Sequence, residues 1–261
     1  MKKPLHDVIF TSDKRKNILL LLQNGPRKME NLLGSLETTR QALLPQIRIL
    51  KDHHLIISKN DIYQLTIIGK TTVDEMVPLL ETIKAFDSNI DYWGNHKLDF
   101  IPDHLFKRFN EVRDFQTIHP GAADAYELNQ DVVKASYRSK SLYILTTFCH
   151  PDFPGMFADL IDKGISVHIV MSEKSLESVK CNYSDVCSKL LKSKLFHSYT
   201  YAKEMNFQEL VYNDYYVLMR LLKNNGNADI NYIVSSNPDS RDWARELFEC
   251  YLKESMPVTE L

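Results

Sequence analysis

Long apolar runs are missing from this sequence of 261 residues. Its most aliphatic run, ILLLL at 18–22, is far too short to cross a bilayer, because a membrane-spanning helix needs about 20 apolar residues. Residues 1–16 also lack the apolar core and the small-residue cleavage site of a secretory signal. We therefore expect a cytoplasmic protein with no membrane partner.

Glycine and cysteine are both scarce. The eight glycines form no GxGxxG, P-loop or GxSxG motif, which argues against phosphate-cradling loops and a serine nucleophile elbow. The four cysteines, Cys149, Cys181, Cys187 and Cys250, lack the CxxC spacing of zinc sites. We expect free thiols in a reducing compartment, with no metal and no other cofactor.

Charge is unevenly distributed along the chain, although the net charge is only −2. Residues 1–70 contain 12 Lys/Arg and 6 Asp/Glu, a balance of +6, and residues 71–261 contain the other 20 basic and 28 acidic side chains, a balance of −8. A basic segment attached to an acidic body is typical of a module that binds a polyanion.

The first seventy residues predict three helices followed by a β-hairpin. A helix through KRKNILLLLQNG begins at a serine or aspartate cap (Ser12 or Asp13) and stops at a Gly-Pro pair, and KMENLLGSL forms a short second helix. The third helix is TTRQALLPQIRILKDHHLI. Two β-type runs, 56–58 and 62–66, then flank a Lys-Asn-Asp turn.

Basic residues crowd the first turn of the first helix, where the helix dipole disfavours them. A nearby phosphate backbone would account for this placement.

The third helix has an apolar face and a polar face, and it contains a proline. Leu43, Ile47 and Leu50 lie on one side at about 100° per residue. The opposite side carries Gln41, Pro45, Arg48 and Asp52. Because Pro45 lies on the outward face, a lost backbone bond there leaves the apolar stripe intact, and we expect a bent helix.

Three helices followed by a hairpin with a basic tip resemble a winged helix-turn-helix. In such proteins the N-terminal residues of the third helix meet base edges in the major groove, and arginine and glutamine can bind purines in a bidentate way. We therefore predict double-stranded DNA as a partner, although winged helices also serve as protein–protein modules. The predicted DNA-binding residues are Thr38, Thr39, Arg40, Gln41, Arg48, Lys59 and Asn60.

Residues 71–124 predict an interrupted helical connector, in which Pro78 is expected to kink the helix. Its apolar stripe comprises Val73, Met76, Val77, Leu80 and Ile83. The stripe fits packing onto the winged domain or a homodimer interface equally well, and the two are compatible. A homodimer is expected because winged-helix proteins commonly bind paired half-sites.

The C-terminal half predicts an α/β domain. SLYILTTF, FPGMFADLIDKG and ISVHIVMS read as strand, helix and strand, which implies a parallel pair with a right-handed crossover. One long helix through EKSLESVKCNYSDVCSKLLKSK follows, then strand candidates at 195–201, 209–212, 215–222 and 230–235. A last helix begins near Pro238 and turns Trp243, Leu247, Phe248 and Tyr251 to the core.

Four segments resemble the archaeal methanogenesis-regulator family, winged-helix transcription factors with a FilR-type C-terminal domain. They are the connector segment DYWGNHKLDFIPDHLFKRFNEV, then LYILTTFCHPDFP, KGISVHIV and IVSSNPDSRDWARELFECYLKES. Ala244 stands where this family usually has glycine, a departure that bears on helix packing. The resemblance implies a transcription regulator whose C-terminal domain senses or dimerises and is similar to phospholipase-D-like regulator domains.

The expected fold is therefore α/β and multi-domain, with a mixed sheet in its C-terminal part. We predict a winged-helix DNA-binding domain at 1–70, a helical connector at 71–124 and a FilR-type effector domain at 125–261.

The sequence argues against an enzyme. Phospholipase-D-like catalysis needs His-x-Lys, and none of the nine histidines has it, since His150 is followed by Pro151 and Asp152. Cys149 and His150 are neighbours on a predicted strand end and would point to opposite faces, so they form no thiolate–imidazole couple. The alternatives kept open are a phospholipase-D-like phosphodiesterase with an accessory winged helix, and an interaction scaffold that binds no DNA.

A small-molecule effector is a further expected partner, because ligands bind α/β sheets at strand ends. The residues predicted to line its pocket are Thr147, His150, Tyr201 and Tyr216. Aromatic residues at such spacing are more often part of a core.

Overall fold

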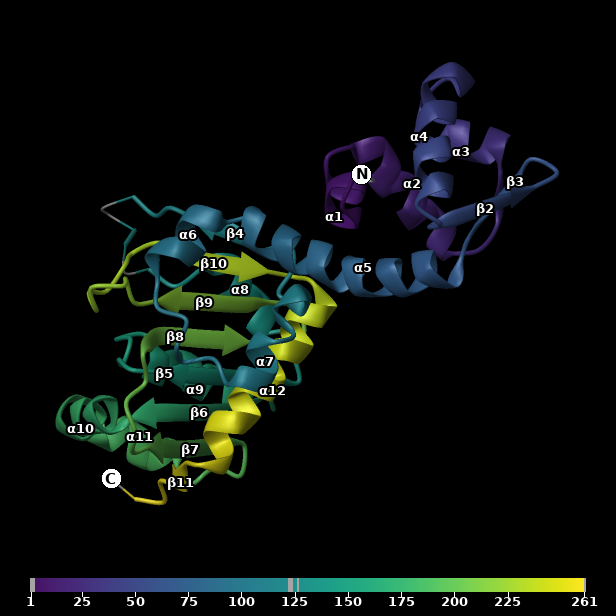
Figure 1. Cartoon of the computed structure of the whole chain (residues 1–261). Helices are drawn as coiled ribbons and strands as arrows, with labels where there is room; N and C mark the ends of the chain where they lie inside the picture. The colour runs from purple at the N-terminus through teal and green to yellow at the C-terminus, as the bar shows by residue number, and fades with distance from the viewer. Residues whose placement is uncertain (1–2, 122–123, 126, 261) are drawn as a thin grey trace. The chain divides into compact units, whose positions relative to one another are not determined.

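The computed structural model in Figure 1 describes residues 3–121, 124–125 and 127–260. The chain forms two compact units, Met1–Glu81 (unit 1) and Thr82–Leu261 (unit 2). The three-part division predicted from sequence differs from this, because the first part of the predicted connector packs within unit 1 and the remainder packs within unit 2.

Unit 1 has the winged helix-turn-helix order that the sequence predicts, with a short helix and a short strand added. Its strands form a three-stranded sheet of order β1-β3-β2, in which all pairs are antiparallel. The elements are α1 (Leu5–Phe10), α2 (Asp13–Gln23), β1 (Arg27–Lys28), α3 (Met29–Ser35), α4 (Arg40–Asp52), β2 (Ile56–Lys59), β3 (Ile62–Leu65) and the start of α5 (Ile67–Asp87).

Side-chain caps set where the two longer helices of the winged fold begin. The Ser12 hydroxyl accepts a hydrogen bond from the Arg15 N–H at 3.4 Å, and the Thr39 hydroxyl accepts one from the Ala42 N–H at 3.4 Å. Each cap satisfies one of the backbone donors that a helix N-terminus leaves unpaired. Ser12, one of the two cap candidates that the sequence left open for α2, is therefore the cap used there, and Thr39 caps α4.

The third helix of the winged fold, α4, continues without interruption through Pro45. Leu43, Ile47 and Leu50 are almost fully buried, whereas Pro45 is exposed. The proline removes one backbone donor on the solvent side, and the buried stripe is unaffected. The bend at Pro45 stays a prediction.

The first turn of α5 packs closely against the segment that follows α4. A Cβ atom on Gly69 would lie 1.9 Å from the carbonyl oxygen of Leu55, so only glycine fits there. Further along, Val73 and Met76 are buried in the same apolar cluster as α2 and α4. Val77 and Leu80 pack against the same cluster, so most of the predicted stripe packs onto the winged fold. Helix α5 continues through Pro78, and the kink there stays a prediction.

Unit 2 is built around an eight-stranded mixed sheet of order β11-β7-β6-β5-β8-β9-β10-β4. Strands β5, β6 and β7 are parallel, as the predicted strand–helix–strand unit requires, and the other pairs are antiparallel. The helices are α6 (Ile90–Asn95), α7 (Asp103–Phe106), α8 (Gln130–Ser136), α9 (Phe153–Asp162), α10 (Glu173–Asn182), α11 (Ser184–Leu190), α12 (Pro238–Lys253) and the 3-10 turn η1 (Phe109–Glu111). The strands are β4 (Gln116–Ile118), β5 (Ser141–Thr146), β6 (Ser166–Ser172), β7 (Phe196–Tyr201), β8 (Phe207–Tyr212), β9 (Val217–Leu221), β10 (Tyr232–Ser235) and β11 (Met256–Pro257).

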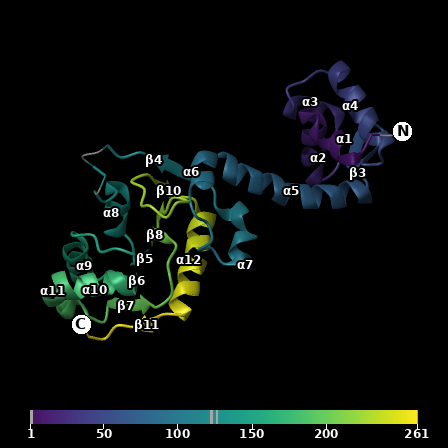
Figure 2. The same ribbon diagram turned by 60° about the vertical axis from the view of Figure 1, so that its left-hand side comes forward.

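Both faces of this sheet are covered, so unit 2 has three layers (Figures 1 and 2). Leu210 and Met219 face a cluster shared with α12 and with residues 92–115, whereas Val211 and Leu218 face a cluster shared with α9, α10 and α11. This alternation follows from the period of two in a strand. The mixed α/β class expected from sequence is confirmed.

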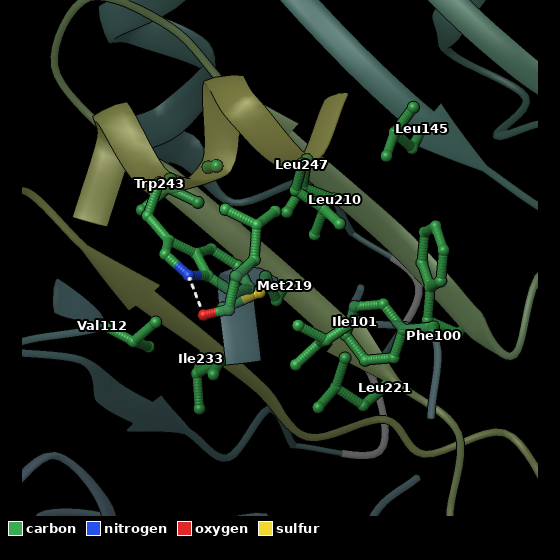
Figure 3. Close-up of a cluster of buried hydrophobic side chains, with 14 of the residues drawn as sticks. Phe100, Ile101, Val112, Leu145, Leu210, Met219, Leu221, Ile233, Trp243 and Leu247 are labelled. Carbon is green, nitrogen blue, oxygen red and sulfur yellow. Dashed lines mark hydrogen bonds between the residues drawn. The ribbon is translucent and has the colours of Figure 1, made fainter. Parts of the chain in front are cut away.

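The last helix, α12, turns Trp243, Leu247 and Phe248 to the sheet, as predicted. Figure 3 shows Trp243 and Leu247 in this cluster. The Trp243 indole N–H donates a 3.1 Å hydrogen bond to the carbonyl oxygen of Leu105. This bond ties the segment before the sheet to the end of the chain, and it satisfies a donor that burial would otherwise leave unpaired.

One predicted helix is divided in two. Residues 173–194 were expected to form a single helix, but α10 ends at Asn182 and α11 begins at Ser184. The Asn182 side chain donates to the Ser178 carbonyl at 2.9 Å, a local bond that competes with helix continuation. Within the residues that the structure describes, no helix is long and apolar enough to span a bilayer.

We expect Gly69→Ala to lower the free energy of unfolding of unit 1 by about 1–3 kcal/mol, because the new methyl group overpacks against the Leu55 backbone. Native-state amide hydrogen exchange of α4 and β3 in the full chain measures this. Gly34→Ala is the matched control, since nothing lies within 4 Å of the added atom. The control should leave the free energy of unfolding unchanged or raise it by up to about 1 kcal/mol. Equal protection in both variants would refute the close contact.

Candidate nucleic-acid interface and ligand pocket

The outward face of α4 is polar and open. Gln41, Pro45 and Arg48 follow one another at helical spacing and are all exposed, directly opposite the buried stripe. Leu44 adds an apolar side chain to this face with 43% exposure. A helix with one face anchored in a core and the other bearing bidentate donors and acceptors can enter a major groove.

The hairpin after α4 closes through two residues with left-handed backbone. Asn60 has φ 51° and Asp61 has φ 60°, which matches the two-residue turn favoured between twisted antiparallel strands. Asparagine and aspartate tolerate this conformation better than other non-glycine residues. Lys59 and Asn60 are exposed at the tip.

An ion pair joins this turn to the first residue of α4. Arg40 Nη2 lies 3.2 Å from Asp61 Oδ1, and that oxygen also accepts a 3.2 Å hydrogen bond from the Tyr63 hydroxyl. The Arg40 and Asp61 side chains are 57% and 45% exposed, so the pair contributes at most about 1 kcal/mol to stability. Its main effect is electrostatic, because a carboxylate beside Arg40 weakens its attraction for phosphate.

Two of the three basic residues at the start of α2, Arg15 and Lys16, have partners within unit 1. Arg15 donates to the Val8 carbonyl, to Thr11 Oγ1 at 2.8 Å and to Gln46 Oε1 at 2.8 Å. Lys16 pairs with Asp13 at 2.8 Å. Arg15 thus ties α1 and α4 to α2, and a phosphate contact of this first turn stays a prediction that now concerns mainly the exposed Lys14.

The structure brings the predicted DNA-binding residues to two adjoining places, the start and outer face of α4 and the hairpin tip. The Thr39 hydroxyl accepts the hydrogen bond that caps α4, and Thr38 is half-buried, so these two residues are less open to another molecule than Gln41 or Arg48. Sequence reasoning missed Asp61, because a pair 21 residues apart leaves no local signal.

The predicted effector pocket is only half assembled. Thr147 and His150 line one cavity of about 490 Å³ at the end of β5. Tyr201 lies instead beside Tyr251, with ring centroids 4.9 Å apart, and donates to Glu254 at 3.3 Å. Tyr216 packs in the cluster on the other face of the sheet from Tyr201. Both tyrosines are therefore corrections to the predicted set, because they lie on opposite faces of the sheet and away from this cavity.

Cys149 and His150 form no nucleophile–base couple. The Cys149 thiol donates to the backbone carbonyl of His150 at 3.7 Å, and His150 Nδ1 accepts from the Asp152 N–H at 3.1 Å. Burial, and then the neighbouring Cys187, raise the pKa of the Cys149 thiol to about 11. A catalytic thiol needs the opposite shift. Among the described residues, no group of three His, Cys, Asp or Glu could hold a metal ion.

Two family descriptions match this chain. Residues 6–84 match the N-terminal domain and residues 125–254 the middle domain of methanogenesis regulatory protein FilR1. The methanogenesis regulatory protein FilR1 of Methanothrix harundinacea (strain 6Ac) is 24% identical over 258 residues, which cover 97% of this chain. The chain spans 58% of the length of that relative.

Two solved structures are also similar. TrmBL2, an archaeal chromatin protein, covers 97% of both chains at 11% identity and a TM-score of 0.43. The phospholipase D family member Nuc from Salmonella typhimurium covers 56% of this chain and 97% of its own, at 15% identity and a TM-score of 0.40. Both TM-scores are below 0.5, so neither likeness assigns a function to this chain.

Thiol labelling tests the environment described for Cys149. At pH 8 a thiol with a pKa of about 11 is thiolate in only about one molecule in a thousand, so Cys149 should react slowly with iodoacetamide, whereas the exposed Cys181 should react first. Peptide mass spectrometry over time gives each rate, and labelling in urea should equalise them. Modification of Cys149 as fast as that of Cys181 would contradict the structure.

Proposed function

The chain belongs to the FilR1 family of methanogenesis regulatory proteins, and from that premise we propose that it is a cytoplasmic, DNA-binding transcription regulator. The observation that carries the proposal is the exposed polar face of α4, which stands opposite a fully buried stripe and is followed by a hairpin with a basic tip. Helix and hairpin are the two elements with which a winged helix approaches a duplex.

Each element has a distinct role in the proposal. Gln41 is near the start of α4 and reads an adenine edge, for which its amide is a bidentate partner. Arg48, two turns further on, contacts a guanine edge or a phosphate. Lys59 and Asn60 reach the backbone or the minor groove from the hairpin tip. The balance of +6 in residues 1–70 supplies the sequence-independent attraction to phosphate.

We further propose that the protein binds DNA as a homodimer. The stripe predicted for this role is largely used within unit 1, because Val73 and Met76 are buried there. The apolar side chains that α5 leaves exposed in unit 1 are Ile67, Ile68 and Leu79, at 83%, 48% and 50%. These residues support a second copy better than the predicted stripe does.

A response to a small-molecule effector completes the proposal, and the cavity lined by Thr147 and His150 supports it. The rival phosphodiesterase function has less support, because the sequence has no His-x-Lys. Turnover of generic phosphodiesters that His150→Ala abolishes would favour that rival.

Arg48→Ala tests the proposed groove contact. A base contact predicts a loss of about 1–3 kcal/mol in binding free energy and relaxed preference at one base pair, whereas a phosphate contact predicts uniform weakening across sequences. Fluorescence anisotropy with DNA selected from genomic fragments, in about 50 to 200 mM salt, separates the two.

Arg245→Ala is the matched control for that experiment, because Arg245 is exposed on α12 in unit 2 and pairs with Glu249 at 3.0 Å. It should leave DNA affinity unchanged. If the unmodified chain selects no genomic DNA and shows no salt-sensitive DNA binding, the proposal is wrong and an interaction scaffold is favoured.

Asp61→Asn should tighten DNA binding. Asparagine keeps an oxygen for the Tyr63 hydroxyl and suits the left-handed backbone, while the lost charge releases Arg40. We expect a gain of about 0.5–1 kcal/mol at low salt that shrinks as salt rises, with a nearly unchanged melting temperature. Glu177→Gln on α10 makes the same change of charge in unit 2 and should have no effect. Weaker binding by Asp61→Asn would show that the ion pair assembles the interface.

A further inference from the structure

Glu209 is buried with one carboxylate oxygen unpaired. The residue is 3% exposed, and its Oε1 has no hydrogen-bond partner among the described residues. Its Oε2 lies 3.5 Å from Nε of Arg220, the residue opposite it on β9. A buried polar atom normally finds a partner, so an unpaired one needs an explanation.

A β-bulge directs two neighbouring side chains to the same cavity. The pairing of β8 with β9 shifts register between Phe207 and Glu209, so Gln208 is the extra residue. Gln208 and Glu209 then both line the cavity of about 490 Å³, whereas neighbours on a regular strand would point apart. Bulges commonly redirect side chains in this way next to binding sites.

Two polar side chains that line this cavity, Gln208 and Thr147, donate their hydrogen bonds within the protein. Gln208 donates from its Nε2 to the carbonyl oxygens of Leu221 and Asp229, at 2.8 and 3.0 Å. Thr147 donates its hydroxyl proton to the Phe207 and Gln208 carbonyls. Glu209 Oε1 has no donor among the described residues, so a ligand that supplies a hydrogen-bond donor would satisfy it.

The fixed charges of the cavity are already balanced. Glu209 faces Arg220 at 3.5 Å, and Asp229 faces Lys223 at 3.5 Å and His96 at 3.0 Å. An ionic ligand would leave one of its own charges unmatched in a poorly solvated site. Phe148, Leu222 and Ile230 supply apolar wall.

We propose that this cavity binds an uncharged small molecule with an apolar body and a hydroxyl or amide N–H that donates to Glu209 Oε1. This proposal gives the chemical class of the proposed effector. It rests on the proposed function only in so far as binding of this molecule is expected to regulate DNA binding. Binding itself needs no DNA. Burial raises the pKa of Glu209 to about 7, against the opposing influence of Arg220. A hydrogen-bond donor on the ligand would stabilise the ionised carboxylate and lower this pKa.

The test uses the full chain without DNA and three probes that share a benzoyl group, benzamide, N,N-dimethylbenzamide and benzoate, and saturation-transfer NMR detects their binding. Benzamide has the donor and no charge, dimethylbenzamide has no donor, and benzoate is an anion. Loss of a hydrogen bond to a charged acceptor should weaken binding of dimethylbenzamide by about tenfold or more relative to benzamide. Benzoate should bind no better than dimethylbenzamide.

The decisive variant is the double replacement Glu209→Leu with Arg220→Met, because removing both members of a buried ion pair usually preserves folding, whereas removing one does not. It should lose benzamide binding, while Glu177→Gln should keep it. No benzamide signal from the unmodified chain, equal signals from benzamide and dimethylbenzamide, or full binding by a folded double variant would each overturn the proposal. DNA binding of the double variant is measured separately without probe, so a failed ligand site and a failed DNA interface give different results.

Discussion

The sheet of unit 2 is apolar on both faces, and covering both faces is the constraint on which the rest of unit 2 depends. Exposed apolar surface costs roughly 25 cal/mol per Å², so neither face can stand open to water. One face is covered by α9, α10 and α11, which are local to the strands. The other is covered by α12 and by residues 92–115, which come from opposite ends of the unit. Hydrogen bonds from Trp243 to Leu105 and from Tyr251 to Phe100 fasten these two segments together.

The same constraint decides which side chains of unit 1 remain free for another molecule. Burial of Leu43, Ile47 and Leu50 against α2 fixes the rotation of α4 about its axis, and Gln41 and Arg48 then face outward. Gly69 lets α5 approach the Leu55 backbone, which brings Val73 and Met76 into the same core. Packing thus sets which face of α4 points outward, and the residues on that face can change while the fold stays the same.

What the sequence predicts well is whatever depends on neighbours within a few residues. The Ser12 and Thr39 caps, the Asn60–Asp61 turn and the buried stripe of α4 all have local causes, and all are present. Pairings between distant residues leave no such signal. Arg40 meets Asp61, Tyr201 and Tyr216 separate to opposite faces of the sheet, and β4 pairs with β10 far along the chain. Each depends on a register or a crossover that only the assembled sheet defines.

The Glu209–Arg220 pair stands out against this background, because packing alone gives no reason for it. Two apolar residues at those cross-strand positions would fill the same space without the cost of removing charges from water, and such replacements are often neutral or stabilising. The contact is also incomplete, because Arg220 approaches only Oε2, at 3.5 Å, and Oε1 has no donor among the described residues. Arg220 is held independently, over the Tyr232 ring at 4.3 Å and by the Glu127 carbonyl at 3.3 Å. Arg220 lowers the pKa of Glu209 against the larger effect of burial, which still raises it to about 7, and the 3.5 Å contact leaves Oε1 able to accept a hydrogen bond.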